Sequence, residues 1–446
     1  MATTYLNRTP SGAGDSNRIF TISLWFKRGT LPGSEQYLFE CNEAADNNDN
    51  FRIVLAGANN IFIQDTEANT SNLDLRTDRL FRDVNSWYHL VLEVDTTQST
   101  SSDRAKLYIN GVQETSFSTE TYPSQNYDTN VSQSGEPFVI GRRESTATPT
   151  SYFDGSMAHY HFVDGTAYDA DTFGETDSTT GEWKPKTNPT VTYGTNGFFL
   201  KFENAAAFGE DDSGNDNDFT SNGSPTQNLD TPTNVLCTLN PLRVERATAA
   251  TYSNGNTTVS ISSATGRVFV ASQYVSAGKY YAEFKHTTST NTDAFIGVVS
   301  PDRDSSTSTN QDIGYRTGEV SWRDNGDIHE GSSTKSDDES TWTTNDILGI
   351  ALDMDNKKVY FSKNGTWQNS ADPSAGTNGY TLSGDEYVMA LDSYSGDGYQ
   401  ANFGNGYFGT TAVTSGNQDD AGHGIFEYDV PTGYYTLNTK NINTYG

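Results

Sequence analysis

Residues 346–366 read DILGIALDMDNKKVYFSKNGT. Two short apolar stretches, 347–353 and 357–362, are separated there by a polar turn, and Asn364-Gly365 follows the second stretch. Stretches of this length that are bounded by Asn, Asp and Gly are typical of β-strands. Asn and Gly accept the positive φ angles that tight turns between strands demand. The segment therefore predicts consecutive strands in the second half of the chain.

Similar patterns recur along the whole sequence. Residues 18–27, RIFTISLWFK, alternate with the period of two that strands show, and Asn110-Gly111 between KLYI and VQET is a strong hairpin signal. Further strands are predicted at 37–41, 51–55, 60–64, 87–94, 105–109, 138–141, 152–163, 198–203, 258–262, 267–271, 278–285, 294–299, 386–391 and 399–403. No segment has a convincing helical pattern. We therefore expect an all-β protein with two antiparallel β-sandwich (jelly-roll-like) domains in tandem.

Composition limits the partners. The chain has 446 residues, enough for two sandwiches of about 200 residues each. Its 58 acidic and 28 basic residues give a formal charge of −30. Such a surface repels phosphate backbones, so we expect no binding to nucleic acid. A surface that keeps the protein soluble explains the charge, and a specific basic partner is the alternative explanation.

The N-terminus and the cysteines bear on the cellular compartment. The first five residues, MATTY, have neither a basic start nor an apolar core, so no signal peptide is expected. No stretch approaches the ~20 apolar residues of a membrane span, so no membrane contact is expected. Cys41 and Cys237 are predicted to be free buried thiols of a protein that folds in a reducing cytoplasm.

The first half contains several short motifs in a characteristic order. The first is Trp87-Tyr88-His89 with the following segment LVLEVD. It is followed by a predicted hairpin at residues 107–111 (sequence L-Y-I-N-G), then by Ile140-Gly141 and by Phe153-Asp154-Gly155. Over roughly residues 15–170 this order resembles concanavalin A-like or laminin G-like jelly rolls. The resemblance implies a lectin-like sandwich, in which we interpret Trp25 and Trp87 as core residues. With a C-terminal extension, this domain is predicted to cover 1–242.

The extension carries a second resemblance. The segments DGTAYDADTFGETDSTTGEWKPK, YGTNGFFLKFENAAAFGEDDSGNDNDFTSNG and LDTPTNVLCTLNPL, within 164–242, are similar to a module of structural proteins in marine tailed phages. This resemblance implies a virion structural protein that is assembled in the host cytoplasm. It also implies multiple copies per particle, with other virion proteins as partners.

The second half resembles the SPRY domain. GKYYAEF at 278–284, FIGVVS at 295–300, the run at 346–366 and ANFG at 401–404 occur in the family's order. SPRY domains are binding modules whose partner surface lies on variable loops. We predict a linker at 243–257, the SPRY-like sandwich at 258–410 and a closing segment at 411–446.

The loops 300–330 and 366–398 contain aromatic residues amid Asp, Asn and Ser. Exposed aromatic faces beside amides and carboxylates suit sugar rings, which combine apolar stacking with directional hydrogen bonds. Packing in the core is the alternative, and Trp342 is interpreted as a core residue. The candidate binding residues are Tyr315, Trp322, Trp367, Tyr394 and Tyr399.

The loop at residues 211–218, DDSGNDND, places several side chains with oxygen atoms around a Gly turn. Ca²⁺ prefers oxygen ligands, although this loop lacks the Glu that an EF-hand has at its twelfth position. Solvated Asx turns explain the same residues. His159 and His161 share one face of a predicted strand, and without a third ligand we interpret them as packed or surface histidines. The candidate calcium ligands are Asp211, Asp212, Asn215, Asp216 and Asp218.

No catalytic constellation is recognised. Glycoside hydrolases of this fold class place two carboxylates in the spacing E-x-D-x-x-E. Here Glu93 and Asp95 are followed by Gln98, so the second carboxylate is missing. No nucleophile–base pair, phosphate-binding loop or zinc spacing is found. The sequence predicts a protein that is not an enzyme.

Two closing peptides are nearly repeated, TPTNVLCTLN at 231–240 and VPTGYYTLN at 430–438. The repeat suggests a shared use, either as a strand returned to its own sandwich or as a contact with a common scaffold. The leading hypothesis is a tail fibre or surface appendage that binds host-surface glycan through many weak sites. The alternative is a capsid decoration protein with purely architectural interfaces, docked through the repeated peptide.

Overall fold

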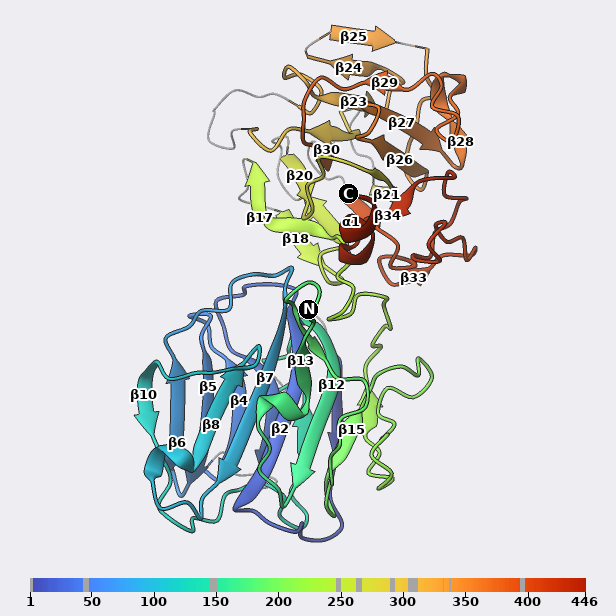
Figure 1. Ribbon diagram of the computed structural model, residues 1–446. Helices are drawn as coiled ribbons and strands as arrows, with labels where there is room; N and C mark the ends of the chain where they lie inside the picture. Colours follow the sequence, from blue (N-terminus) through green and yellow to red (C-terminus); the bar gives the residue numbers. More distant parts are fainter. Residues whose placement is uncertain are drawn as a thin grey trace. The chain divides into compact units, whose positions relative to one another are not determined.

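The computed structural model describes residues 3–42, 48–144, 151–245, 250–261, 267–288, 293–303, 312–331, 333–336, 338–393 and 398–446 (Figure 1). The chain divides into two compact units, Met1–Gln227 and Asn228–Gly446. Nearly all regular structure in each unit is antiparallel β-sheet, which confirms the predicted fold class. In the described part of the chain, the one α-helix is α1 (Thr439–Tyr445), and no helix is long and apolar enough to cross a membrane.

The first unit contains two large sheets whose inner faces share one core. The described strands of the first sheet, in spatial order, are β10 (Phe117–Thr121), β6 (Thr70–Thr77), β5 (Ile61–Glu67), β4 (Asn50–Leu55), β3 (Gln36–Asn42), β11 (Phe138–Ile140), β1 (Tyr5–Arg8) and β16 (Thr220–Asn222). Those of the second are β15 (Phe198–Leu200), β12 (Gly155–Asp164), β2 (Ile19–Arg28), β7 (Trp87–Asp95), β8 (Ala105–Ile109) and β9 (Val112–Gln113). A hairpin of β13 (Gly174–Thr176) and β14 (Trp183–Pro185) follows β12 in the chain.

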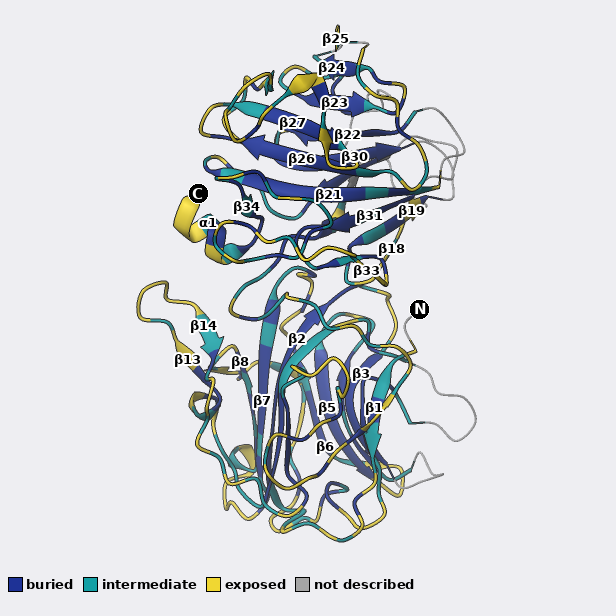
Figure 2. Ribbon diagram, turned by 90° about the vertical axis from the view of Figure 1, so that its right-hand side faces the viewer, coloured by how far each residue is buried: buried dark blue, intermediate teal, exposed yellow. Residues whose placement is uncertain are grey.

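Alternation along β2 explains why both faces of the second sheet are covered. Phe20, Ile22 and Leu24 are fully buried in the core between the sheets. Trp25 points to the opposite face, where a smaller cluster that includes Phe173 covers neighbouring strands. Trp25 and Trp87 are both buried, which confirms their interpretation as core residues. Figure 2 shows the strands mostly buried and the turns exposed.

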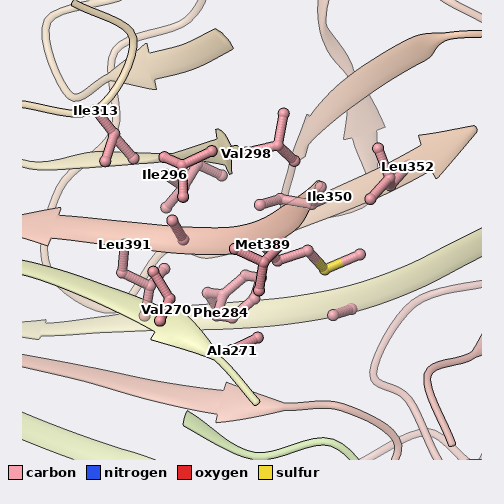
Figure 3. Close-up of a cluster of buried hydrophobic side chains, with 14 of the residues drawn as sticks. Val270, Ala271, Phe284, Ile296, Val298, Ile313, Ile350, Leu352, Met389 and Leu391 are labelled. Atoms are coloured by element: carbon pink, nitrogen blue, oxygen red, sulfur yellow. The ribbon is translucent and has the colours of Figure 1, made fainter. Parts of the chain in front are cut away.

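The second unit is also a sandwich. In the described residues, one sheet has the order β17 (Leu239–Glu245), β20 (Arg267–Ala271), β30 (Val388–Ser393), β22 (Phe295–Val299), β23 (Val320–Arg323), β24 (Ile328–Glu330) and β25 (Ser333–Ser336). The other has β18 (Ala250–Ser253), β19 (Thr258–Ile261), β31 (Gly398–Asn402), β21 (Lys279–Thr288), β26 (Ile347–Asp353), β27 (Lys358–Lys363) and β28 (Thr366–Trp367), with β29 (Tyr380–Thr381) beside β27 and β34 (Tyr435–Thr436) beside β21. A small sheet joins β32 (Tyr407–Phe408) and β33 (Thr411–Ala412). Side chains of both large sheets meet in the core of Figure 3.

The closing segment covers the outer face of β21, β26 and β27. Phe426 and Tyr434 from this segment form a buried cluster with Tyr281 and Tyr360 of the sheet. The carboxylate of Glu283 on β21 accepts hydrogen bonds from the backbone N–H groups of Glu427 at 2.9 Å and Tyr428 at 2.8 Å. The closing segment is therefore an integral layer of this unit.

The structure divides the chain at a different position from the predicted domain boundary. The first unit ends at Gln227, before the predicted boundary at 242. The predicted linker 243–257 contains the end of β17 and all of β18. These are edge strands of their sheets, and along β18 every second residue is exposed. A half-exposed edge strand carries many polar residues, so its composition resembles that of a linker.

The two closing peptides pair with each other inside the second unit. The backbone N–H of Cys237 donates to the carbonyl of Leu437 at 3.0 Å, and that of Thr439 donates to the carbonyl of Val235 at 3.0 Å. Leu236 and Asn438 form a β-bridge between these contacts. The repeat therefore joins both peptides within the second unit. For 430–438 this is the predicted return to its own sandwich, whereas 231–240 was expected to close the first domain. Cys41 and Cys237 are buried and form no disulfide, as predicted.

Candidate functional site

The outer face of the β22–β23–β24 sheet presents a group of aromatic and charged side chains. Ile296 and Val298 of β22 point into the core (Figure 3), and Phe295 lies on the other side of the strand, where it is also buried, with 1% exposure. Arg323 pairs with Phe295 across the strands. His329 follows the core residue Ile328 and so faces outward as well. We call this group the Tyr315 surface, and it comprises Asp293, Phe295, Tyr315, Arg323, Asp327 and His329.

Tyr315 is the aromatic centre of this surface. Its ring stacks on His329 with centroids 4.7 Å apart and an interplanar angle of 24°, and its edge meets Phe295 at 6.2 Å. The Arg323 guanidinium lies 5.6 Å from the centre of the Phe295 ring and forms an ion pair with Asp293. Tyr315 remains partly exposed. A partly exposed ring supported from beneath is a suitable stacking platform for a ligand.

His329 leaves hydrogen-bonding capacity unused. Its side chain is 5% exposed, and neither ring nitrogen has a hydrogen-bond partner. Nε2 lies 3.9 Å from a carboxylate oxygen of Asp327, beyond hydrogen-bond range. Burial lowers the pKa of His329, so the ring is neutral near pH 7 and offers one donor and one acceptor. Buried polar groups are normally paired, so the two His329 nitrogens are among the exceptions in the described residues.

The loop that carries Tyr315 is fixed by buried polar contacts. The carboxylate of Glu319 accepts from Arg303 at 2.5 Å and from the backbone N–H of Gly314 at 3.0 Å, and both ion-pair side chains are 1% exposed. The backbone N–H of Ile313 donates to Asp392 at 2.9 Å. Gly314 has φ +86°, and a Cβ there would overlap Ser321 Oγ. These contacts hold Tyr315 in place before any ligand arrives, which lowers the entropy lost on binding.

The structure places the five predicted binding residues very differently. Trp322 and Tyr399 are fully buried in the core, and the Tyr399 hydroxyl donates to the carbonyl of Asp392 at 3.0 Å. Neither can meet a ligand, so both predictions are wrong. The physical reason is strand alternation, which directs Trp322 into the core and its neighbour Arg323 outward.

The remaining candidates do not gather at one place. Trp367 is partly buried against Tyr281 on the outer face of the other sheet, with ring centroids 6.3 Å apart. Tyr394 lies outside the described residues. Only Tyr315 therefore belongs to the surface described above. Sequence analysis missed His329 because β24 was not predicted, and a strand there would have alternated Ile328 inward and His329 outward.

In the predicted calcium loop, backbone N–H groups and an arginine donate hydrogen bonds to the side-chain oxygens. The carboxylate of Asp211 accepts from the backbone N–H groups of Phe199, Ser213 and Asn217 at 2.8–2.9 Å. Arg8 donates to Asn217, and the acidic side chains of Asp211 and Asp218 act on the Arg8 charge. Throughout the described residues, no three His, Cys, Asp or Glu side chains are grouped to hold a metal ion. The calcium ligands therefore stay a prediction, and Asx turns with an arginine account for the contacts that the loop makes in this structure.

The histidines of β12 are packed or partly exposed, as predicted. His161 is buried, stacks on Phe199 at 3.9 Å and shares a 2.9 Å hydrogen bond with the Tyr193 hydroxyl. His159 is partly exposed and lies in a β-bulge with φ +47°. Burial lowers the pKa of His159 to about 4.

A buried Ser–His pair in the first unit has the wrong polarity for nucleophilic catalysis. Trp183 Nε1 donates to His89 Nδ1 at 2.9 Å, and His89 Nε2 lies 2.9 Å from Ser23 Oγ. Burial lowers the pKa of His89 to about 3, so the ring is neutral. Because Nδ1 is the acceptor, the proton sits on Nε2 and is donated to Ser23. The histidine therefore cannot act as the base that activates this hydroxyl.

Glu93 and Asp95 are both committed to local contacts. Glu93 accepts from the Tyr108 hydroxyl at 2.9 Å and pairs with Lys106 at 3.3 Å. Asp95 accepts from Thr97 and Gln98 where β7 ends. These contacts agree with ordinary roles at a strand and its end.

Comparison with protein families finds one matching family in each of the two compact units. The family of the concanavalin A-like lectin/glucanases superfamily matches residues 2–171, and the SPRY domain family matches residues 279–406. The chain carries a concanavalin A-like domain and a SPRY domain in tandem. Such domains are typical of binding or scaffolding proteins. None of the curated proteins matches this chain in sequence.

Solved structures show similarity at low identity. The SPRY domain of human HERC1 is 18% identical with a TM-score of 0.30, and the match covers 36% of this chain and 96% of that one. Another human SPRY domain is 18% identical with a TM-score of 0.28, covering 34% of this chain and 94% of that one. A heptameric SAP-like pentraxin from Limulus polyphemus is 14% identical with a TM-score of 0.28, covering 37% and 72% respectively.

Proposed function

We propose that this chain is a non-enzymatic binding protein whose SPRY domain recognises carbohydrate through the Tyr315 surface. The observation that carries the proposal is a rigidly held, partly exposed tyrosine ring beside an imidazole with two unpartnered nitrogens. Sugar rings have an apolar C–H face that stacks on aromatic rings and hydroxyl groups that donate and accept hydrogen bonds. Tyr315 supplies the stacking face, and the more exposed carboxylates of Asp293 and Asp327 at the same surface supply acceptors for the sugar hydroxyl groups.

Binding through so few groups would be weak at each site. A single exposed stacking contact contributes about 1 kcal/mol, and a neutral hydrogen bond contributes about 1 kcal/mol. Useful affinity then requires several copies on one particle or cell surface. The −30 formal charge favours a partner without phosphate backbones, and nucleic acid is not proposed as a partner.

A role without catalysis is supported by the first unit. The neutral His89 donates to Ser23, and Glu93 is engaged by Tyr108 and Lys106. No grouped metal ligands are found in the part of the chain that the structure describes. These features leave binding as the activity that best accounts for the preformed Tyr315 surface.

For the biological setting we propose a virion appendage or tail fibre, which rests on the resemblance of residues 164–242 to structural proteins of tailed phages. The alternative of a capsid decoration protein relied on the repeated closing peptide as a docking strand. Because the two copies pair with each other inside the second unit, the repeat no longer supports that alternative. We therefore favour the adhesive role.

A glycan array with the intact protein tests the proposal. The array compares wild type with Tyr315→Ala and with Tyr407→Ala, a partly exposed tyrosine of the same unit outside the Tyr315 surface. We expect selective glycan binding that Tyr315→Ala abolishes and Tyr407→Ala preserves. Binding that survives Tyr315→Ala, or no binding to any glycan, would overturn the proposal.

A further inference from the structure

The charges around Tyr315 point to a more specific ligand. Burial raises the pKa of the Tyr315 hydroxyl; Arg323 opposes this shift, and Asp312, Asp293 and Asp327 add to it. Arg323 is ion-paired with Asp293, and a second carboxylate, that of Asp324, lies 4.0 Å from its Nε. Acidic groups therefore outnumber the arginine at this surface.

The nearby basic residues are directed toward other partners. Arg303 is buried in its ion pair with Glu319, and Arg316 also acts on the Glu319 carboxylate. His329 is neutral at pH 7 because burial disfavours its charged form. The surface around the ring thus has an excess of negative charge, within a chain of formal charge −30.

We propose that the Tyr315 surface selects an amine-bearing carbohydrate, a sugar with a free protonated amino group, over its neutral N-acetylated form. This inference rests on the proposed carbohydrate binding. An ammonium group over the Tyr315 ring gains a cation–π attraction. The carboxylate of Asp327 adds a charge-assisted hydrogen bond to the same ammonium group.

The geometry places the Asp327 carboxylate beside the Tyr315 ring. His329 stacks on Tyr315 with ring centroids 4.7 Å apart, and its Nε2 lies 3.9 Å from the Asp327 carboxylate, so Asp327 and the Tyr315 ring flank the same imidazole. An acetamide on the same sugar carries no charge and is bulkier, so it loses the attraction to Asp327 and to the Tyr315 ring.

The test compares two ligands of equal length, a β-1,4-linked glucosamine hexamer and the corresponding N-acetylglucosamine hexamer, by isothermal titration calorimetry with the full chain. We expect the glucosamine hexamer to bind about tenfold more tightly at low salt, since one cation–π contact and one or two partly exposed charge pairs add. The preference should weaken as ionic strength rises, because exposed charges are screened.

Two variants assign the preference to the site. Asp327→Asn removes one charge with little change of shape and should reduce the preference about threefold, leaving binding of the acetylated hexamer unchanged. Asp385→Asn removes the same charge from a fully exposed residue of the same unit and should leave the preference intact. Unchanged melting temperatures for both variants establish that the fold is intact.

The outcomes separate the two proposals. If both hexamers bind equally and Tyr315→Ala abolishes both, the preference for an amine is refuted and carbohydrate binding stands. If the glucosamine hexamer binds without regard to Asp327 or Tyr315, its attraction is to the acidic protein as a whole, and the inference is also refuted. If neither hexamer binds, amine selection is refuted, and the glycan array alone decides the proposed function.

Discussion

Replacing Gly314 with alanine should disturb the Tyr315 surface from beneath. Gly314 adopts φ +86°, and an added Cβ would overlap Ser321 Oγ and lie 3.0 Å from the Cβ of His329. Ser321 Oγ donates to the carbonyl of Ile313 at 2.8 Å. Relief of the overlap requires this hydroxyl to rotate away or the loop to lift from the sheet. Either movement changes the support beneath Tyr315.

The cost can be worked out from these contacts. The left-handed conformation costs a non-glycine residue about 1–2 kcal/mol. Loss of the Ser321 hydrogen bond adds about 1 kcal/mol. Gly314→Ala should therefore destabilise the local structure by about 2–3 kcal/mol. Gly376→Ala is a matched control, because Gly376 has φ +72° with no atom within 4 Å of the added Cβ, and it should cost only the conformational term of about 1–2 kcal/mol.

Hydrogen exchange at the amides of β22–β24 in the intact protein measures the local free energy of opening for both variants. We expect Gly314→Ala to lower it by about 1 kcal/mol more than Gly376→Ala does, and to weaken glycan binding. Ser321→Ala added to Gly314→Ala should recover part of the loss. Equal effects of the two glycine variants on β22–β24 would refute the claim that the loop is fixed by close contact at Gly314.

Three further predictions concern the rest of the molecule. The pKa of His159 is about 4 in the folded protein and about 6.5 in the unfolded chain, so between these pH values the unfolded chain binds a proton that the folded protein does not. The stability that the neutral His159 side chain contributes is therefore full above pH 6.5 and is lost as the pH falls toward 4. Denaturant unfolding should therefore show that His159→Gln has a weaker acid dependence than wild type, by about 2 kcal/mol between pH 7 and 4.5, and an identical dependence would contradict this. Glu283→Ala removes the acceptor for two backbone N–H groups of the closing segment, so exchange of the Glu427 and Tyr428 amides should accelerate at least about tenfold, whereas unchanged protection would show that the segment is held otherwise. A fragment that begins at Asn228 should fold cooperatively. A fragment that begins at residue 243 should not, because it lacks the 231–240 peptide and its buried Leu236. Two equally cooperative melting curves would refute the role of the pairing.

The sequence was sufficient to predict strands that are central in their sheets. β8 and β26 have the predicted bounds, because β8 alternates buried and partly buried residues and β26 is a short apolar run bounded by polar turns. Asn110-Gly111 forms the expected turn, with φ values of +50° and +79°. Edge strands such as β18 were missed, because half of their side chains meet water and their polar composition is that of a loop.

The candidate site was predicted only in part. Tyr315 was identified from its aromatic type in a polar loop, but Trp322 and Tyr399 have the same signature and lie in the core. What separates them is the register of the strands, which composition does not reveal. The unpartnered state of His329 depends on contacts between β23, β24 and the Tyr315 loop, and these become visible only when the sheet is assembled.

The most direct test of carbohydrate binding at Tyr315 is a nuclear magnetic resonance titration of the ¹³C-tyrosine-labelled protein with the best glycan from the array. Our account predicts that the Tyr315 ring signals, assigned by their loss in Tyr315→Phe protein grown with the same label, shift with saturation while the glycan's own spectrum shows no cleavage. Shifts confined to other tyrosines, or conversion of the glycan to shorter products, would contradict it.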